Sequence, residues 1–300
     1  MSVRVLVAED DPGLRSVLGP GLRRGGHVVD IVADGAAALG NFDPDKRRTM
    51  KLPDLLAAAC PPIGRLGAAF YFVPETLAKG KELGLDGFRF YFLGRGGVLG
   101  DVEAPVVGSA FGYFEPTVMA RMWDSSRQVM APRDAARAYL ACAHDMGRRL
   151  LGDVGDLAPF CQEAEKVANA AEVAALTLFA GLVAEPLPDD PPARAMQLLA
   201  VLRELRGSAH LVAVRAVGLP PQIAHYLRRP GDYALFGWRG DPPEVTDEDR
   251  RLLAEADAGT DRLVGPAYAA LDDAGQHALL GGLARIAPPI DAATVAPAAG

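Results

Sequence analysis

Apolar residues recur at steps of three and four positions along most of this chain, in alanine-rich runs bounded by proline and glycine. This spacing places the apolar side chains on one face of a helix, and proline near the start with glycine after the end marks its bounds. The pattern therefore predicts a mainly α, multi-helical domain over residues 52–290 and a disordered tail at 291–300. The helices expected are Asp54–Cys60 (closed by Pro61-Pro62), Pro74–Leu83, Pro116–Trp123, Pro132–Leu151, Leu157–Phe179, Ala193–Val217, one that opens at Thr246, and Asp273–Ile286.

Charge and cysteine content narrow the class of protein. The 31 Lys and Arg residues against 38 Asp and Glu give a net charge of −7, which argues against a protein held to DNA mainly by neutralising phosphates. The three cysteines are widely spaced without a CxxC pair, so they favour a reducing cytoplasm over a disulfide framework or a zinc site. No apolar run approaches the roughly 20 residues that cross a bilayer, and acidic residues come too early for a signal peptide. We therefore expect a cytoplasmic protein with no membrane partner.

The first 40 residues differ from the rest of the chain. Two β-branched runs, at residues 3–8 and 27–32, flank a stretch with leucine and valine at helical spacing. This order predicts a short α/β unit, β-α-β, of the kind that opens a parallel doubly wound sheet. The stretches VRVLVAEDDPGLRSVL and HVVDIVADGAAAL resemble the N-terminus of two-component response-regulator receiver domains.

The receiver resemblance implies a metal-binding role for the acidic pair after the first strand. In receiver domains this pair helps to hold Mg²⁺ beside a phosphoacceptor aspartate, and it corresponds here to Glu9 and Asp10. Mg²⁺ is the one cofactor implied, and no other is expected. A receiver domain continues with a third strand that ends in the phosphoacceptor, whereas residues 40–48 here are polar and interrupted by proline. We therefore interpret residues 1–40 as a truncated receiver-like remnant that has lost phosphotransfer, and residues 41–51 as a linker.

Aromatic residues are concentrated between Phe70 and Trp123, a stretch that holds 11 of the 20 in the chain. Their clusters lie beside glycines, and such an arrangement can line a pocket for a flat or apolar ligand. The alternative is that these rings form the core of the helical domain. Because charged residues among buried rings need partners, we expect an ion pair between Glu75 and Arg95.

Arg203, Arg206 and His210 form a cationic stripe, since their spacing places them on one face of a helix. The stripe can bind a carboxylate or a phosphate group. Alternatively, it takes part in buried ion pairs with the aromatic segment, for which Glu75 is a candidate partner. No co-ligand stands at metal-binding spacing from His210. The predicted ligand-binding residues are Tyr71, Glu75, Arg95, Phe114, Arg203, Arg206 and His210.

Charge is segregated in the C-terminal third of the chain. Residues 194–229 contain six arginines and one acidic residue, whereas residues 241–261 contain eight acidic residues and two arginines. Oppositely charged segments this close in sequence are expected to pair within the chain. The sequence contains no GxSxG, no P-loop motif and no zincin motif, so it names no reaction and favours a protein that is not an enzyme.

Five dispersed motifs within residues 52–287 carry a second resemblance. They are FYFVPETLAKGKELGLDGF, FLGRGGVLGDV, FGYFEP, LLAVLRELRGSAH and GTDRLVGPAY. With these motifs the chain resembles an actinobacterial family labelled helix-turn-helix. The resemblance implies a winged-helix-like region between Phe236 and Asp261, with DNA as a partner. A recognition helix needs a basic surface, however, and residues 245–258 offer only two arginines among many acidic residues.

These patterns together predict a regulatory or ligand-sensing helical protein. A small molecule, DNA and a second copy of the chain in a homodimer are the partners left open. The alternative is a small-molecule-binding enzyme or carrier that uses the pocket of aromatic, arginine and histidine residues.

Overall fold

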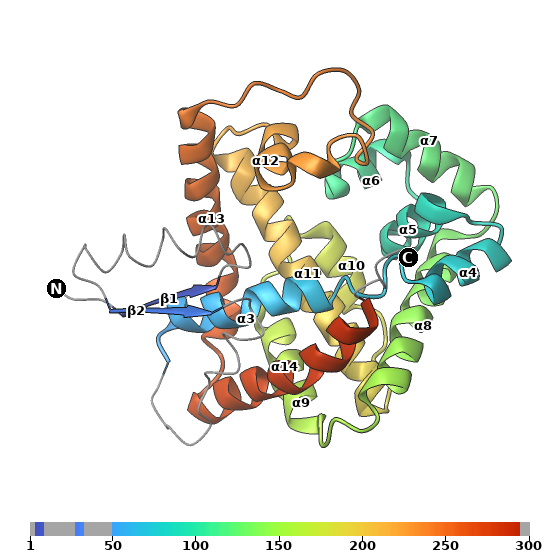
Figure 1. Ribbon diagram of the computed structural model, residues 1–300. Helices are drawn as coiled ribbons and strands as arrows, with labels where there is room; N and C mark the ends of the chain where they lie inside the picture. The colour runs from blue at the N-terminus through green and yellow to red at the C-terminus, as the bar shows by residue number, and fades with distance from the viewer. Residues whose placement is uncertain (1–3, 9–27, 33–49, 295–300) are drawn as a thin grey trace, which may run out of the picture.

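The computed structural model describes residues 4–8, 28–32 and 50–294, whose arrangement is shown in Figure 1. The predicted Mg²⁺ pair, Glu9 and Asp10, lies outside the described residues, as does nearly all of the predicted linker. Both therefore stay predictions.

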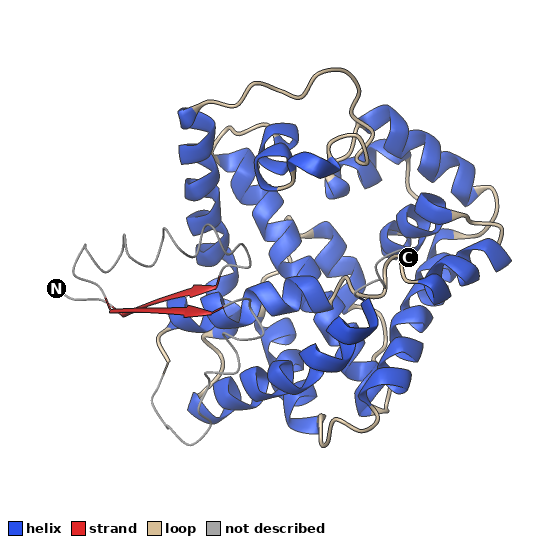
Figure 2. Ribbon diagram, viewed as in Figure 1, coloured by secondary structure: helices blue, strands red, loops and turns tan. Residues whose placement is uncertain are grey.

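Helices make up almost all of the described chain (Figure 2), which confirms the mainly α fold. None of the described helices combines the length and the apolar character that crossing a membrane requires. The helices are α3 Leu52–Leu66, α4 Pro74–Glu82, α5 Gly87–Gly96, α6 Ala104–Phe111, α7 Pro116–Arg127, α8 Pro132–Leu151, α9 Ala158–Ala170, α10 Thr177–Val183, α11 Pro191–Ala216, α12 Pro221–Arg228, α13 Asp247–Tyr268 and α14 Asp273–Thr294, with short 3₁₀ turns η1 Gly97–Leu99 and η2 Pro230–Asp232.

Helix α11 runs through the middle of the helical body (Figure 1). Every residue from 195 to 202 is buried; all of them are apolar except Gln197, whose amide is hydrogen-bonded to His144 and to the Pro186 carbonyl. A helix of this kind is stable only when other elements surround it. Helices α8, α13, α9, α3 and α10 all pack against it. The main core is therefore built around α11, and side chains on α11 face several helices at once.

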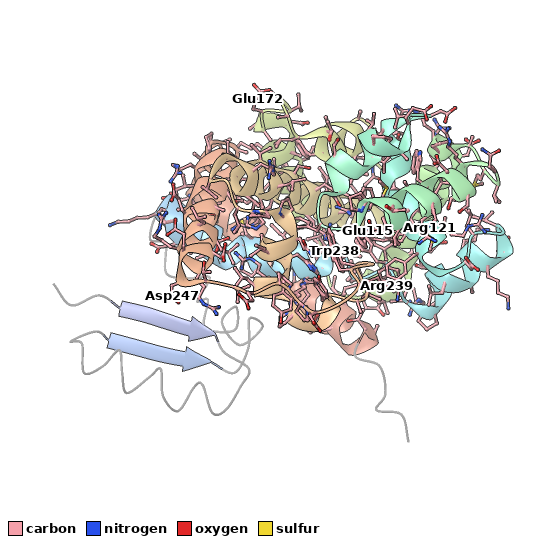
Figure 3. All side chains as sticks on the ribbon, turned by 90° about the horizontal axis from the view of Figure 1, so that it is seen from above. Glu115, Arg121, Glu172, Trp238, Arg239 and Asp247 are labelled. Atoms are coloured by element: carbon pink, nitrogen blue, oxygen red, sulfur yellow. The ribbon has the colours of Figure 1, made fainter. Side chains whose placement is uncertain are left out.

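The N-terminal part contributes two short parallel strands, β1 Arg4–Ala8 and β2 Val28–Val32. They pair in register, with Arg4 opposite Val28 and Ala8 opposite Val32. Figure 3 shows this pair standing apart from the helical body. The stretch that connects the two strands is outside the described residues, so the predicted β-α-β unit is not shown and its receiver-like character stays a prediction.

Prolines do not end helices where the sequence predicted. Helix α3 continues through Pro61 and Pro62 to Leu66, and α14 continues through Pro288 and Pro289 to Thr294. In α3 the side chains of Pro62, Ile63 and Leu66 are buried. Their burial offsets the backbone hydrogen bonds that proline cannot donate. Residues 291–294 consequently belong to the last helix and not to the predicted tail.

The single helix predicted over Leu157–Phe179 is two helices, α9 and α10. The chain leaves helical geometry after Ala170, and Ala175 has a φ of 64°, in the left-handed region. Leu176, Leu178 and Phe179 on the far side of the break enter the same core as α9. The apolar spacing therefore continues across the break between α9 and α10. For this reason the sequence pattern predicted one helix instead of two.

The end of α11, the helix α12 and the first half of α13 form a small unit with its own core. Its buried residues are Ala213, Val214, Leu219, Ala224 and Ala256. A turn at residues 217–220 joins α11 to α12, and Gly218 in that turn has a φ of 80°. Two helices joined by a turn of three or four residues that contains glycine have the shape of a helix-turn-helix.

The turn at Gly218 gives a direct stability prediction. Nothing lies within 4 Å of a Cβ built at Gly218 or at Gly64 of α3, so only the backbone conformation differs between the two sites. We expect Gly218→Ala to destabilise the fold by about 1 kcal/mol, because an L side chain is strained in the left-handed region. Gly64→Ala should stabilise it by up to about 1 kcal/mol through helix propensity. Urea unfolding followed by circular dichroism measures both, and equal effects at the two sites would contradict the assigned turn.

Candidate ligand-binding site

A pocket of about 200 Å³ lies between the aromatic segment and the helices α11 and α12. Its apolar lining includes Phe111, Phe114, Leu211 and Phe236. Four arginines line it against one acidic residue, so the lining is strongly cationic. The polar lining residues are Tyr91, Arg95, Tyr113, Arg203, Glu204, Ser208, His210, His225, Arg228 and Arg229.

A buried ion pair connects α5 to α11 at this pocket. Arg95 on α5 donates two hydrogen bonds to the Glu204 carboxylate, from Nε to Oε1 at 2.7 Å and from Nη2 to Oε2 at 2.9 Å. Arg203 Nη1 donates to the same Oε1 at 2.8 Å, and the Tyr71 hydroxyl donates to it at 3.2 Å. The two-pronged contact of Arg95 is the strongest geometry available to an arginine and a carboxylate.

The ion pair keeps Glu204 charged although the side chain is almost fully buried. Burial alone would raise the pKa of the Glu204 carboxyl, but the charges of Arg95 and Arg203, with the hydrogen bonds, outweigh it and lower the pKa to about 2. The guanidinium of Arg95 also lies over the ring of Phe111, with 4.5 Å to the centroid, and that of Arg203 lies over Tyr71 at 4.9 Å. Arg95, Arg203 and Glu204 together retain one positive charge beside the pocket.

Three adjoining rings, two of them stacked, form another part of the pocket lining. Phe114 and Phe236 stack with their centroids 4.1 Å apart, and the ring of His225 lies 3.8 Å from that of Phe236. Both ring nitrogens of His225 and the hydroxyl of Tyr113 are shut off from solvent without a hydrogen-bond partner among the described residues. Burial lowers the pKa of His225 to about 4 and raises that of Tyr113. His225 is therefore a neutral imidazole at pH 7, and Tyr113 keeps its proton.

Acidic residues of α13 neutralise part of the cationic surface of α11 and α12. Arg206 Nη1 lies 2.7 Å from Asp261 Oδ1, and Arg228 forms an ion pair with Asp257. The prediction that the basic and acidic segments pair within the chain is confirmed. Arg228 is therefore shared between the pocket lining and α13.

The protonation of His210 follows from its neighbour Thr260. The Thr260 hydroxyl donates to the Ala256 carbonyl at 2.7 Å, so its oxygen can only accept from His210 Nδ1, which lies 2.9 Å away. Burial lowers the pKa of His210, which keeps the ring neutral at pH 7. The proton is then on Nδ1, and Nε2 is left as a hydrogen-bond acceptor.

A strap of residues 230–246 follows α12 and crosses beside the pocket. Phe236 of the strap lines the pocket and accepts a backbone hydrogen bond from Glu115, while Trp238 Nε1 donates to the Tyr113 carbonyl at 3.0 Å. Figure 3 shows Trp238 next to Glu115. The strap contains turns and loop without any strand, so the winged-helix-like region predicted from Phe236 onward has no wing.

The structure brings together four of the predicted ligand-binding residues and separates three. Arg95, Phe114, Arg203 and His210 line the pocket. Tyr71 is buried beside them and contacts Glu204 but does not line this pocket. The other two predicted residues, considered next, have partners elsewhere.

The predicted ion pair between Glu75 and Arg95 is wrong. Glu75 lies on the surface of α4 and pairs with Arg149 of α8 at 3.1 Å, while Arg95 is paired with Glu204. Arg206, the third separated residue, is turned toward Asp261. The alternative of a buried ion-pair network between α11 and the aromatic segment is confirmed, with Glu204 in place of Glu75.

The sequence pattern did not predict five further pocket residues: Glu204, Tyr113, His225, Arg228 and Arg229. Glu204 is the single acidic residue among six arginines, a contrast that marks it as a buried counter-charge. His225 and Arg228 are three residues apart and so share one face of α12, and Arg229 directly follows the helix. No group of three or more His, Cys, Asp or Glu side chains within residues 50–294 is arranged to hold a metal ion.

Replacing the charged Glu204 side chain with a neutral one should greatly lower the stability of the fold, because it breaks the buried ion pair. We expect Glu204→Gln to cost about 3–5 kcal/mol at pH 7, since it leaves the buried Arg95 without its counter-charge. The matched control is Glu75→Gln, which removes an exposed pair and should change stability by less than about 1 kcal/mol. Urea unfolding measures both, and equal losses would mean that the buried pair contributes no more than the exposed one.

The loss of stability caused by Glu204→Gln should depend on pH. The folded-state pKa of Glu204, about 2, lies below its ordinary value of 4.5. The stabilisation is therefore fully present above pH 4.5 and is lost as the pH falls toward 2. Because the glutamine does not titrate, the stability difference between wild type and Glu204→Gln should narrow from pH 5 to pH 3. A difference that stays constant over this range would contradict the lowered pKa.

Comparison with known families gives one match. The model of a family described as a helix-turn-helix family matches residues 58–236, more than half of the chain. The match begins after both N-terminal strands, ends at Phe236, and contains every residue that lines the pocket. Comparison with curated proteins and with solved structures gave no match. The chain belongs to this helix-turn-helix family.

Proposed function

We propose that this chain is a ligand-sensing regulatory protein, in which a small molecule bound in the pocket acts on the helix-turn-helix unit. The observation that supports this proposal is the position of α12. One face of α12 contributes His225 and Arg228 to the pocket, and Arg229 follows directly after the helix, while Ala224 packs in the small core with α11 and α13. A ligand that contacts α12 therefore acts directly on the second helix of the helix-turn-helix unit described above.

The pocket is suited to a small ligand. Binding sites for drug-sized molecules have volumes of about 300–1,000 Å³. At about 200 Å³ this pocket fits a compact molecule, and its four arginines favour one that carries negative charge.

The coupling between ligand and α12 runs through Arg228. Its guanidinium is paired with Asp257 of α13, yet the residue also lines the pocket. A bound anion competes with Asp257 for this arginine. The ligand thereby weakens one of the contacts that hold α12 against α13, which gives binding a route to a change in the helix-turn-helix unit.

DNA is the macromolecular partner that membership of the family supports. Arg215 at the end of α11, and Arg229 and Arg239 after α12, are exposed and basic. Phosphate contacts from such residues give salt-dependent affinity. The first turn of α13, with Asp247, Glu248 and Asp249, is unsuited to contact DNA, so we assign any DNA contact to the turn between α11 and α12.

An enzyme or carrier would use the same pocket. The shared use of α12 by the pocket and by the helix-turn-helix core favours a sensor, because catalysis or transport has no need of that connection. Mass spectrometry of a bound compound after incubation separates an enzyme, which changes the compound, from a sensor or a carrier, which returns it unchanged. A sensor differs from a carrier in that its bound compound changes the affinity for DNA.

Gly207 provides a test of the pocket that should leave the fold intact. It lines the pocket, and a Cβ placed on it meets no atom closer than Glu204 Oε2 at 4.0 Å. We expect Gly207→Leu to fill the space and to keep or raise the thermal stability, because leucine is a better helix former than glycine. In a thermal-shift screen of metabolites, compounds that stabilise the wild type should fail to stabilise this variant.

Gly64→Leu on α3 is the matched control, since it is also a helical glycine with open space around its Cβ but does not line the pocket. It should respond to the same compounds as the wild type. If Gly207→Leu kept the response to every compound, the pocket would not be the sensing site.

DNA binding has its own test. Fluorescence anisotropy with duplexes selected from a random pool should show binding that weakens as salt rises from 50 to 200 mM, in line with phosphate contacts. Arg215→Ala should reduce the affinity for all duplexes, while Arg137→Ala on α8 should not. Absence of salt-dependent binding at any salt concentration would exclude DNA as the partner and leave the ligand site to be judged separately.

A further inference from the structure

Arg203 presents hydrogen-bond donors to the pocket that the protein itself does not use. In the described part of the chain its guanidinium donates one hydrogen bond, from Nη1 to Glu204 at 2.8 Å. Nε and Nη2 have no acceptor there, and neither of these two nitrogens is shut off from solvent. The side chain is three-quarters buried and its guanidinium lies over the ring of Tyr71, which holds it in place. A fixed and accessible pair of donors is therefore left over in the pocket lining.

The free pair of donors on Arg203 has the geometry of a carboxylate site. Nε and Nη2 are the same two atoms with which Arg95 holds Glu204, at 2.7 and 2.9 Å. Their N–H bonds point the same way, so that one carboxylate accepts both hydrogen bonds in parallel. Since Arg95, Arg203 and Glu204 together retain one positive charge, a single carboxylate balances the charge at this end of the pocket.

Arg228 of α12 is a second cation with unused donors. Its Nη2 donates to Asp257 of α13, whereas Nε and Nη1 have no acceptor among residues 50–294. The side chain is about half exposed, and neither of these nitrogens is shut off from solvent. Unlike Arg203, Arg228 shares its charge with an acidic residue of another helix. A second anionic group in the pocket therefore competes with Asp257 for Arg228.

The two arginines lie at different points along α11. His210 Nδ1 is 3.7 Å from the same aspartate oxygen to which Arg228 donates, so Arg228 lies close to His210. His210 is seven residues after Arg203, which is a rise of about 10 Å along a helix. Between these positions α11 presents Gly207 and Ser208 to the pocket, and both are small and uncharged. The pocket therefore offers two cations about two helical turns apart, with space between them.

We propose that the ligand is a short-chain dicarboxylate, a dianion with one carboxylate at each end of a short carbon chain. One carboxylate accepts two hydrogen bonds, from Nε and Nη2 of Arg203. The other binds Arg228 and weakens its pair with Asp257, and the carbon chain lies over Gly207. This assignment rests on the proposed sensing function and specifies what is sensed, because the second carboxylate lets a ligand that is held on α11 act on α12.

Calorimetric titration of the full chain with the dicarboxylates from malonate to suberate tests this class. These acids differ only in the number of methylene groups between the carboxylates, so their affinities should pass through a maximum at the length that spans the two arginines. The best of them should bind one per chain. It should bind about tenfold more tightly than the monocarboxylate with the same number of carbons, because it makes a second hydrogen bond to a charged group. Gly207→Leu should abolish all of this binding.

A phosphonate distinguishes the second carboxylate from a more highly charged group. 3-Phosphonopropionate carries a phosphonate in place of one carboxylate of succinate. It should bind more weakly than the best dicarboxylate, since its additional negative charge lies next to Asp257.

Arg228→Gln isolates the second cation and leaves the donors of Arg203 in place. In this variant the best dicarboxylate should bind no more tightly than the matching monocarboxylate. Arg206→Gln is the control, because it also breaks a pair with α13, through Asp261, but Arg206 does not line the pocket. The control should keep the full preference for the dicarboxylate. A preference that survives in Arg228→Gln, or that is lost equally in Arg206→Gln, would overturn the assignment of Arg228.

Arg203→Lys isolates the parallel pair of donors. It keeps a positive charge beside Glu204 but cannot donate two parallel hydrogen bonds. Mono- and dicarboxylates should therefore both bind about tenfold more weakly. Unchanged affinities in a folded Arg203→Lys would overturn the assignment of Arg203.

Failure of this inference differs from failure of the sensing function. If a monocarboxylate or 3-phosphonopropionate bound as tightly as the best dicarboxylate, and Gly207→Leu blocked that binding, the pocket would stand and the dicarboxylate class would be wrong. The same conclusion holds if no dicarboxylate bound while another compound of the thermal-shift screen was blocked by Gly207→Leu. If Gly207→Leu blocked no compound of any class, both proposals would fail.

Discussion

The buried pair of Arg95 and Glu204 is the contact on which the arrangement of this protein depends. Removing two charges from water is costly, and the cost is recovered only when geometry is good and the remaining polar atoms have partners. Here both carboxylate oxygens are occupied, by Arg95, Arg203 and the Tyr71 hydroxyl. Because these donors come from α5, α11 and the turn after α3, the pair fixes the aromatic segment at one position along the central helix. The pocket exists at that position because the rings of α5 and α6 cannot slide along α11.

The pair of Arg95 and Glu204 also determines which hydrogen-bonding groups of the pocket remain available to a ligand. Oε1 of Glu204 accepts three hydrogen bonds and Oε2 accepts one, and the charges of Arg95 and Arg203 more than balance that of the carboxylate toward an incoming anion. Arg203 uses only one of its donors. The lining therefore acts as a cationic surface although it contains a carboxylate. Helix α12 lies between this surface and α13, which is the arrangement on which the proposed sensing function rests.

Much of the fold could be predicted because helix periodicity is a local property. The bounds of Pro132–Leu151 match α8, and the Thr246 cap of α13 is formed as a reciprocal capping box with Asp249. The helix predicted to end before Pro61 and Pro62 in fact continues through them. The backbone hydrogen bonds that proline cannot donate are a local property and can be predicted from the sequence. The burial that offsets their loss depends on helices that are distant in the sequence. The predicted ion pair between Glu75 and Arg95 was wrong for the same reason. Which acidic residue meets Arg95 depends on the crossing of α5 and α11, and no spacing in the sequence records that crossing. His225 could not be predicted as a pocket residue from the sequence, because its distinguishing feature, burial without a hydrogen-bond partner, exists only after folding.

The acidic stretch of residues 241–261 has two structural uses, and neither concerns nucleic acid. Asp247, Glu248 and Asp249 occupy the first turn of α13, where negative charge is stabilised by the helix dipole and where Asp249 completes the cap. Asp257 and Asp261, further along α13, neutralise Arg228 and Arg206 on the neighbouring helices. The negative charge is therefore explained by the folding of α13 itself, and it carries no information about DNA at the turn between α11 and α12. Arg215, Arg229 and Arg239 are exposed, and within the described chain none of them forms an ion pair with residues 241–261, so the acidic stretch does not cancel the basic charge on which the proposal of DNA binding rests.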